Sequence, residues 1–145
     1  MRNSRQSWSS QQERVGKLLE SAGLSSGEEF LRRFPSEISV GQAQRILIVM
    51  ALIHSPLLLI ADEPTSALDV ITQREVLDLL TRIGKQRQMS MLFISHDLLT
   101  VATRCHRLAI LHAGKIVETG QVQEVLSAPK HPYTKLLIAA VPKFE

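Results

Sequence analysis

Apolar residues recur along the chain with two different spacings, which predict helices in some segments and strands in others. From Val15 to Ala22 they return every three or four residues, the spacing of an amphipathic helix, and Gly23 follows as a stop signal. By contrast, the short apolar runs Leu57–Ala61 and Met91–Ser95 are typical of strands that are buried on both faces of a sheet. The chain therefore combines helices with buried strands.

A helical pattern separates the two apolar runs, and this order indicates the fold class. A strand, a helix and a second strand in succession predict a βαβ unit with parallel strands and a right-handed connection. We therefore predict an α/β protein with parallel strands flanked by helices. Further elements are predicted in chain order: a helical turn at Glu28–Phe34, helices from Ser39 to about His54, Val70 to about Gln86 and Asp97 to about Cys105, a strand at Arg107–His112, a turn at Ala113-Gly114, an antiparallel strand at Lys115–Glu118, and helices at Val122–Ser127 and Thr134–Val141.

Two adjacent carboxylates, Asp62 and Glu63, stand at the predicted exit of the first strand, and Pro64 then turns the chain. Ligands bind at the carboxyl ends of strands in open α/β sheets. There a carboxylate can hold a hard cation such as Mg²⁺ or polarise a water molecule. His96 follows the second strand, at what we predict to be the same edge. Taken singly, such acids more often mark a solvated strand exit, and a lone histidine is more often structural.

Two predicted helices begin with a good N-cap residue. Ser39 precedes one and Asp69 precedes the other, and either side chain can accept hydrogen bonds from the first backbone N–H groups. A helix N-terminus also carries a partial positive charge, so it can bind an anion. The segment Ser39-Val-Gly-Gln42 is thus consistent with an anion site or with a simple capped helix.

Composition excludes several classes of protein. The chain has 145 residues, 44% hydrophobic and 21% charged, the proportions of a globular domain. Its single cysteine, Cys105, cannot form an internal disulfide bond. The net charge is only +3, the basic residues are scattered and 4% of residues are aromatic, so we predict no nucleic-acid partner. The most apolar region, Ile46–Ala61, is too short and too interrupted to span a bilayer, and no secretory signal is visible.

The order of these motifs resembles the ATPase subunits of ABC transporters. In that family a signature motif precedes an acidic strand end (Walker B), a D-loop and a switch histidine, matching here Ser39–Gln42, Asp62-Glu63, Ser66–Asp69 and His96. The segment His131-Pro-Tyr-Thr134 resembles the corresponding segment of the ATPase subunits in the dipeptide, oligopeptide and nickel importer branch. The resemblance covers the chain from about residue 14 onward.

The resemblance implies a role for each matched residue. Asp62 would organise Mg²⁺, Glu63 would act as the general base, and His96 would contact the γ-phosphate of ATP and orient the attacking water. The remaining matched residues would contact ATP bound by the opposite subunit or cross the dimer interface: Ser39, Gly41, Gln42 and Asp69.

The sequence departs from the family pattern at two points. Val40 replaces the first glycine of the signature pair, and a β-branched residue cannot readily take a positive φ, so we expect altered affinity rather than loss of the site. A Walker A motif is also missing, because none of the Gly-Lys pairs at Gly16, Gly84 and Gly114 is followed by Ser or Thr. We interpret the chain as a C-terminal fragment of such a subunit, which would expose apolar surface when expressed alone.

This interpretation divides the chain into four segments and leads to one principal function. The segments are a disordered 1–12, a partial helical subdomain at 13–54, the C-terminal part of a RecA-like ATPase core at 55–120, and the start of a peptide-importer extension at 121–145. The implied function is the ATP-hydrolysing subunit of a peptide or nickel importer, located on the inner face of the cell membrane with permease subunits and a second ATPase. Two alternatives stay open: a non-catalytic module that supplies its signature in trans, or a soluble ABC ATPase without a transport role. The sequence does not indicate the transported solute.

Overall fold

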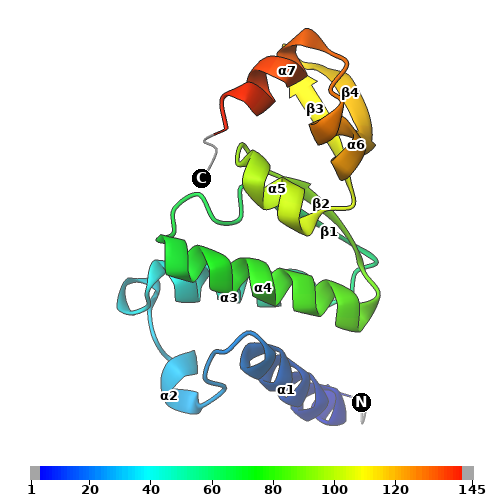
Figure 1. Cartoon of the computed structure of the whole chain (residues 1–145). Helices are drawn as coiled ribbons and strands as arrows, with labels where there is room; N and C mark the ends of the chain where they lie inside the picture. Colours follow the sequence, from blue (N-terminus) through cyan, green and yellow to red (C-terminus); the bar gives the residue numbers. More distant parts are fainter. Residues whose placement is uncertain (1–3, 142–145) are drawn as a thin grey trace. The chain divides into compact units, whose positions relative to one another are not determined.

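The computed structural model describes residues 4–141, with side chains from residue 10 onward, and divides into two compact units. The first unit comprises residues 1–92 and the second comprises residues 93–145, so the boundary falls inside the second strand. Figure 1 shows the elements of both units. Their bounds are α1 Ser4–Ser21, α2 Glu28–Leu31, a 3₁₀ helix η1 Pro35–Glu37, α3 Val40–Leu52, β1 Leu58–Asp62, α4 Val70–Arg87, β2 Ser90–Ile94, α5 Leu98–Arg104, β3 Arg107–His112, β4 Lys115–Gln121, α6 Val122–Ser127 and α7 Pro132–Ala139.

The core of the first unit is formed by the apolar faces of three helices. α3 contacts both α1 and α4, and Leu52 of α3 and Val76 of α4 are completely buried. Burying a side chain of this size contributes roughly 1.5–3 kcal/mol, so the stripes that predicted amphipathic helices also hold the unit together. The other core side chains of these helices are Leu18, Leu19, Ile48, Val49, Leu77, Leu79, Leu80 and Ile83.

The first helix is longer than predicted. α1 begins at Ser4 and so extends through residues 4–12 of the segment that was expected to be disordered, and residues 1–3 lie outside the described part. The other end of α1 is held by two arginines, because Arg82 donates to the carbonyl of Ser21 (2.5 Å) and Arg45 to that of Ala22 (3.3 Å). Cations at a helix C-terminus satisfy its free carbonyls and interact favourably with its dipole.

The two predicted parallel strands are present, but they are not buried on both faces. β1 and β2 form a two-stranded sheet, with the connecting α4 between them in the chain. Burial alternates along β1, where Leu59 is buried while Leu58 and Ile60 are 52% and 59% exposed. No residue of β2 is fully buried. The described residues supply a layer for only one face of β1, which confirms the expected exposure of apolar surface.

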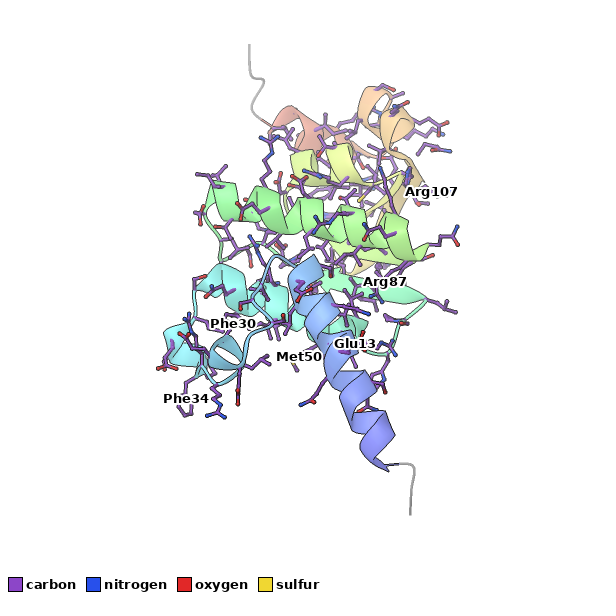
Figure 2. All side chains as sticks on the ribbon, turned by 90° about the horizontal axis from the view of Figure 1, so that it is seen from below. Glu13, Phe30, Phe34, Met50, Arg87 and Arg107 are labelled. Atoms are coloured by element: carbon purple, nitrogen blue, oxygen red, sulfur yellow. The ribbon has the colours of Figure 1, made fainter. Side chains whose placement is uncertain are left out.

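Exposed apolar side chains occur elsewhere in the first unit as well. Phe34 is 70% exposed before η1, and Met50 is 58% exposed on α3 (Figure 2). None of the described helices is long and apolar enough to cross a bilayer. Phe34 and Met50 are apolar side chains on the surface of the first unit.

In the second unit the predicted hairpin is confirmed. β3 pairs antiparallel with β4 around Ala113 and Gly114, whose φ values of 48° and 74° suit a two-residue hairpin turn. β4 extends to Gln121, beyond the predicted end at Glu118, and Leu108 and Ile110 of β3 pack against α6. The last helix begins at Pro132 and ends at Ala139, so the predicted bounds of 134–141 are wrong by two residues at each end.

The segment His131-Pro-Tyr-Thr134 has a structural role at every position. His131 caps α7 by accepting a hydrogen bond from the Tyr133 N–H through Nδ1, and Pro132 occupies the first helical turn, where its missing N–H costs nothing. The Tyr133 ring stacks on His112 of β3 with the ring centroids 3.8 Å apart, and Thr134 is completely buried. The motif therefore attaches α7 to the hairpin.

Glu118 of β4 completes this attachment. Its carboxylate accepts hydrogen bonds from the backbone N–H groups of Lys130 (2.9 Å) and His131 (3.0 Å). The Thr134 hydroxyl also lies close enough to stabilise the carboxylate, although its geometry falls short of a regular hydrogen bond. Together the Thr134 hydroxyl and the two N–H groups lower the pKa of Glu118 to about 2.

We predict that this attachment weakens in acid. The pKa of Glu118 is about 2 in the folded chain, below its ordinary value of 4.5, so its stabilising contribution is full above pH 4.5 and is lost as the pH falls towards 2. Carboxylate titration followed by NMR should give a midpoint near 2 for Glu118, and Glu118→Gln should speed amide exchange at Lys130 and His131. Glu124→Gln, on the exposed side of α6, is the control. A Glu118 midpoint near 4.5 would show that the attachment is absent in solution.

Candidate functional site

The two adjacent acids lie where β1 ends. Asp62 is the last residue of the strand and is exposed, whereas Glu63 is half-buried and begins the turn. Glu63 has a φ of +44°, in the left-handed region that non-glycine residues rarely adopt. Both the N–H and the hydroxyl of Ser66 donate to the Glu63 carbonyl, at 3.4 and 3.2 Å, and this closes the turn. A strained carboxylate residue at a strand end is typical of functional sites.

The segment predicted as a signature motif is a capped helix start. The Ser39 hydroxyl accepts a hydrogen bond from the Gln42 N–H (3.2 Å), and the Gln42 side-chain oxygen accepts one from the Ser39 N–H (3.0 Å). This reciprocal pair is a capping box. Because the Ser39 oxygen acts as the acceptor, its own proton stays available for donation to an anion.

Val40 does not strain the signature segment. It is the first residue of α3 and is absent from the residues of positive φ, and its side chain is 60% exposed. The backbone at Val40 is helical, so the unusual angle that a β-branched residue would oppose is not present, and altered affinity stays a prediction. Any effect of Val40 on ligand binding would come from its side chain.

Thr72 of α4 contacts both Gly41 of α3 and Asp69, the residue before α4. This residue was not identified in the sequence analysis. A Cβ atom at Gly41 would lie 2.5 Å from Thr72 Cγ2, so a side chain at residue 41 would clash with Thr72 unless one of the two shifted. The Thr72 hydroxyl in turn donates to Asp69 (2.6 Å). A threonine three residues after an N-cap aspartate, on the helix that follows the D-loop, is the only sequence signal for this role.

Asp69 is the N-cap of α4, as its sequence context indicated. Its carboxylate accepts hydrogen bonds from the N–H groups of Ile71 (3.1 Å) and Thr72 (3.0 Å) as well as from the Thr72 hydroxyl. The Thr72 hydroxyl makes the largest contribution to the lowered pKa of this carboxyl group. Asp69 therefore stays ionised and orders the D-loop segment against α4.

His96 lies after β2, in the second unit, and is exposed. The next residue, Asp97, caps α5 by accepting hydrogen bonds from the Leu99 N–H (3.0 Å) and the Thr100 hydroxyl (2.5 Å). Partial burial acts to raise the pKa of Asp97, but these hydrogen bonds and the neighbouring His96 outweigh it and lower that pKa. The convergence of His96 with Glu63 stays a prediction, since the two residues belong to different units.

The described residues supply only part of a metal site. No group of three or more His, Cys, Asp or Glu side chains gathers anywhere between residues 10 and 141. Mg²⁺ does not require such a group, because it is commonly held by one or two carboxylates together with substrate phosphates and water. The exposed carboxylate of Asp62 at the end of β1 fits that mode of binding.

Comparisons with known proteins place the chain in a family. Residues 1–66 match the ABC transporter family, and residues 117–145 match the oligopeptide/dipeptide transporter C-terminal region. The oligopeptide transport ATP-binding protein OppD of Bacillus subtilis is 47% identical over 132 residues, covering 91% of this chain and 37% of OppD. The dipeptide transport ATP-binding protein DppD of Escherichia coli is 40% identical over 136 residues, covering 94% of this chain and 42% of DppD.

Solved structures agree with this placement. CbiO1 of Clostridium perfringens, part of the ABC transporter complex cbiONQ, superposes with a TM-score of 0.69 at 28% identity, covering 80% of this chain and 45% of CbiO1. An ATP-binding cassette in its ADP conformation gives a TM-score of 0.72 at 23% identity, which shows a shared fold. The chain spans less than half the length of the curated relatives named above. It is therefore a member of the ABC transporter ATP-binding proteins of the oligopeptide/dipeptide branch, and covers part of the ABC domain together with the C-terminal region of that branch.

Proposed function

We propose that the chain is part of an ATP-hydrolysing subunit of a peptide importer and that Glu63 is its general base. The observation that carries this proposal is the left-handed backbone of Glu63 at the end of β1. Such a conformation costs on the order of 1–3 kcal/mol in a non-glycine residue, and it persists only where the surroundings hold it. A fixed carboxylate at the carboxyl end of a strand is well placed to take a proton from an attacking water.

The other predicted residues act on the phosphate, the water and the metal ion. His96 contacts the γ-phosphate and orients the water, while Asp62 holds Mg²⁺ with water and phosphate oxygens as the other ligands. When bound, Mg²⁺ neutralises part of the phosphate charge. The exposed position of Asp62 and the position of His96 directly after β2 support these roles.

The start of α3 acts on ATP held by a second ATPase subunit. Ser39 donates its free hydroxyl proton to phosphate, Gly41 lets α3 and α4 approach closely, and Gln42 fixes the serine through the capping box. Asp69, which is linked to Gly41 through Thr72, crosses the interface between the subunits. The dimer works with permease subunits at the inner face of the cell membrane and energises the import of peptides. The names of the relatives, which specify oligopeptide transport and dipeptide transport, support the peptide part of this proposal.

A grafted cassette tests the proposed function. In it, residues 14–145 replace the aligned segment of the Bacillus subtilis OppD, whose identity of 47% favours a compatible core. We expect the grafted cassette to bind and hydrolyse ATP. If it folds and binds ATP but releases no phosphate, while the parent OppD hydrolyses ATP in the same assay, the proposal is wrong.

A second candidate function is a module that supplies its signature in trans. The observation that favours it is the free hydroxyl proton of Ser39, in a sequence that contains no Walker A motif. Adding the chain to intact OppD would then raise ATP hydrolysis, and Ser39→Ala would abolish that stimulation. Unchanged hydrolysis by OppD would exclude the module.

A further inference from the structure

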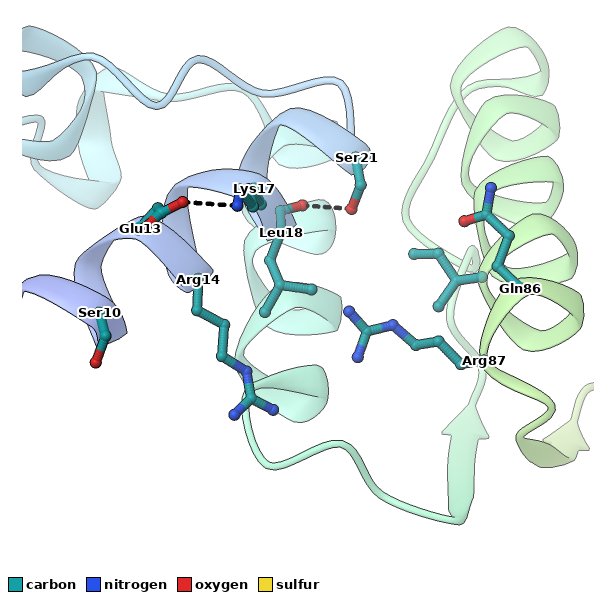
Figure 3. Close-up of a pocket in the computed structure, with 9 residues that line it drawn as sticks. Ser10, Glu13, Arg14, Lys17, Leu18, Ser21, Gln86 and Arg87 are labelled. Atoms are coloured by element: carbon teal, nitrogen blue, oxygen red, sulfur yellow. Dashed lines mark hydrogen bonds and ion pairs between the residues drawn. The ribbon is translucent and has the colours of Figure 1, made fainter. Parts of the chain in front are cut away.

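A cavity of about 380 Å³ lies between α1 and α4 of the first unit, and none of the candidate site residues lines it (Figure 3). Arg14 and Lys17 line it from α1, and Arg87 lines it from the last turn of α4. Figure 3 shows the side chains of Arg14 and Arg87 extending towards one another from the two helices. Both arginines are exposed, so water screens part of their mutual repulsion, and an anion between them would reduce it further.

Among the described residues, the two guanidinium groups share one neutral acceptor. Arg14 donates to the Ser55 hydroxyl oxygen at 2.6 Å, and Arg87 donates to the same oxygen at 3.5 Å. Neither guanidinium forms an ion pair with a carboxylate of the described residues. The two arginines therefore converge on one point, and most of their N–H donors have no acceptor among the described residues.

The charge at the cavity is positive. Its one carboxylate, Glu13, is already paired with Lys17 at 2.7 Å, and this pair lowers the pKa of Glu13 and raises that of Lys17. The pair is neutral overall, which leaves the charges of Arg14 and Arg87 uncompensated. An anion that binds between the two guanidinium groups would remove their mutual repulsion.

The walls of the cavity are held in place, and its floor is apolar. Arg82 of α4 donates to the Ser21 carbonyl at the end of α1, so the two helices are joined beside the cavity. Leu18 and Ile83 line it and are each only 2% exposed. The cavity therefore combines a cationic entrance with a hydrophobic base, a combination that suits an organic anion better than a bare ion.

We propose that this cavity binds a small phosphomonoester dianion. Each guanidinium fork can bind two phosphate oxygens in parallel, so a tetrahedral dianion satisfies both forks at once, whereas a carboxylate satisfies one. Ser55, which now accepts from both arginines, would turn its hydroxyl proton towards a phosphate oxygen. The organic part of the ligand would lie at the mouth of the cavity, above the closely packed base that Leu18 and Ile83 form.

Calorimetric titration of the chain with phenyl phosphate, inorganic phosphate and benzoate tests the proposal. We expect saturable binding in the order phenyl phosphate, inorganic phosphate, benzoate. Binding of phenyl phosphate should weaken between about pH 7.5 and about pH 5, because the second pKa of a phosphomonoester is near 6. Arg14→Gln and Arg87→Gln should each weaken phenyl phosphate binding about tenfold or more. Arg14→Lys, which keeps the charge but loses the fork, should be intermediate.

Arg74→Gln is the matched control, because it removes an exposed arginine from α4 that does not line the cavity. Binding by this variant should stay within about twofold of the unmodified chain. The proposal is overturned if the chain shows no saturable binding, if Arg74→Gln weakens binding as much as Arg87→Gln, or if benzoate binds as tightly as phenyl phosphate. Circular dichroism of each variant verifies that the helices are retained.

Discussion

Replacing Glu63 by Gln in the grafted cassette is expected to lower ATP turnover by about 10²–10⁴-fold while ATP still binds. The amide has nearly the same shape as the carboxylate but cannot take a proton from water. The left-handed backbone at residue 63 does not depend on the charge, so the turn closed by Ser66 should persist. Phosphate release measures turnover, and equilibrium binding of a fluorescent ATP analogue measures the retained affinity.

Glu29→Gln is the matched control for this prediction. Glu29 lies in α2, its side chain is 92% exposed, and its ion pair with Arg33 is at the surface. Such exposed ion pairs contribute little to the stability of the fold, so ATP turnover by the Glu29→Gln cassette should be unchanged. If the Glu63→Gln cassette hydrolyses ATP at the rate of the unsubstituted cassette, Glu63 is not the base.

Gly41→Ala is expected to destabilise the first unit by roughly 1–3 kcal/mol, the usual cost of overpacking a well-packed contact. The added methyl group would lie 2.5 Å from Thr72 Cγ2. The threonine cannot easily rotate away, because its hydroxyl is held by Asp69 at 2.6 Å and its β-branched side chain has few rotamers. Urea unfolding of the whole chain, followed by circular dichroism, measures the change.

A double substitution distinguishes this clash from a general loss of helix stability. Thr72→Ser removes Cγ2 and keeps the hydroxyl that bonds to Asp69, so Gly41→Ala/Thr72→Ser should recover most of the lost stability. Thr72→Val is the opposite control, because it keeps the methyl group and loses the hydroxyl, and should give no recovery. Equal stabilities of Gly41→Ala and the unsubstituted chain would show that α3 and α4 are further apart in solution.

Local signals predicted the second unit well. The Ala113-Gly114 turn, the strand Arg107–His112 and the helix Val122–Ser127 agree with the structure, because turn chemistry and helix boundaries are encoded within a few residues. The N-cap roles of Ser39 and Asp69 were visible for the same reason. The family resemblance located the acids, the signature and the His131-Pro-Tyr-Thr134 segment, and the comparisons confirm the branch.

Features that depend on distant contacts were not predictable. The apolar run Leu57–Ala61, most of which forms β1, is typical of a strand that is buried on both faces. Burial depends on which layers are present, however, and the described residues cover only one face. The contact between Gly41 and Thr72 joins residues far apart in the chain and has no periodic signature. The role of Glu118 was hidden because its partners are backbone N–H groups, which every sequence contains.

The attachment made by Glu118 has a consequence for the order of folding. It joins residues only 12 and 13 positions apart, and the β3–β4 pairing likewise joins near neighbours in the chain. Contacts of such low sequence separation form quickly, because little loop-closure entropy must be overcome. During synthesis on the ribosome, the hairpin and the attachment made by Glu118 can thus form as soon as residue 134 has left the exit tunnel. Neither requires a contact with a more distant segment of the chain.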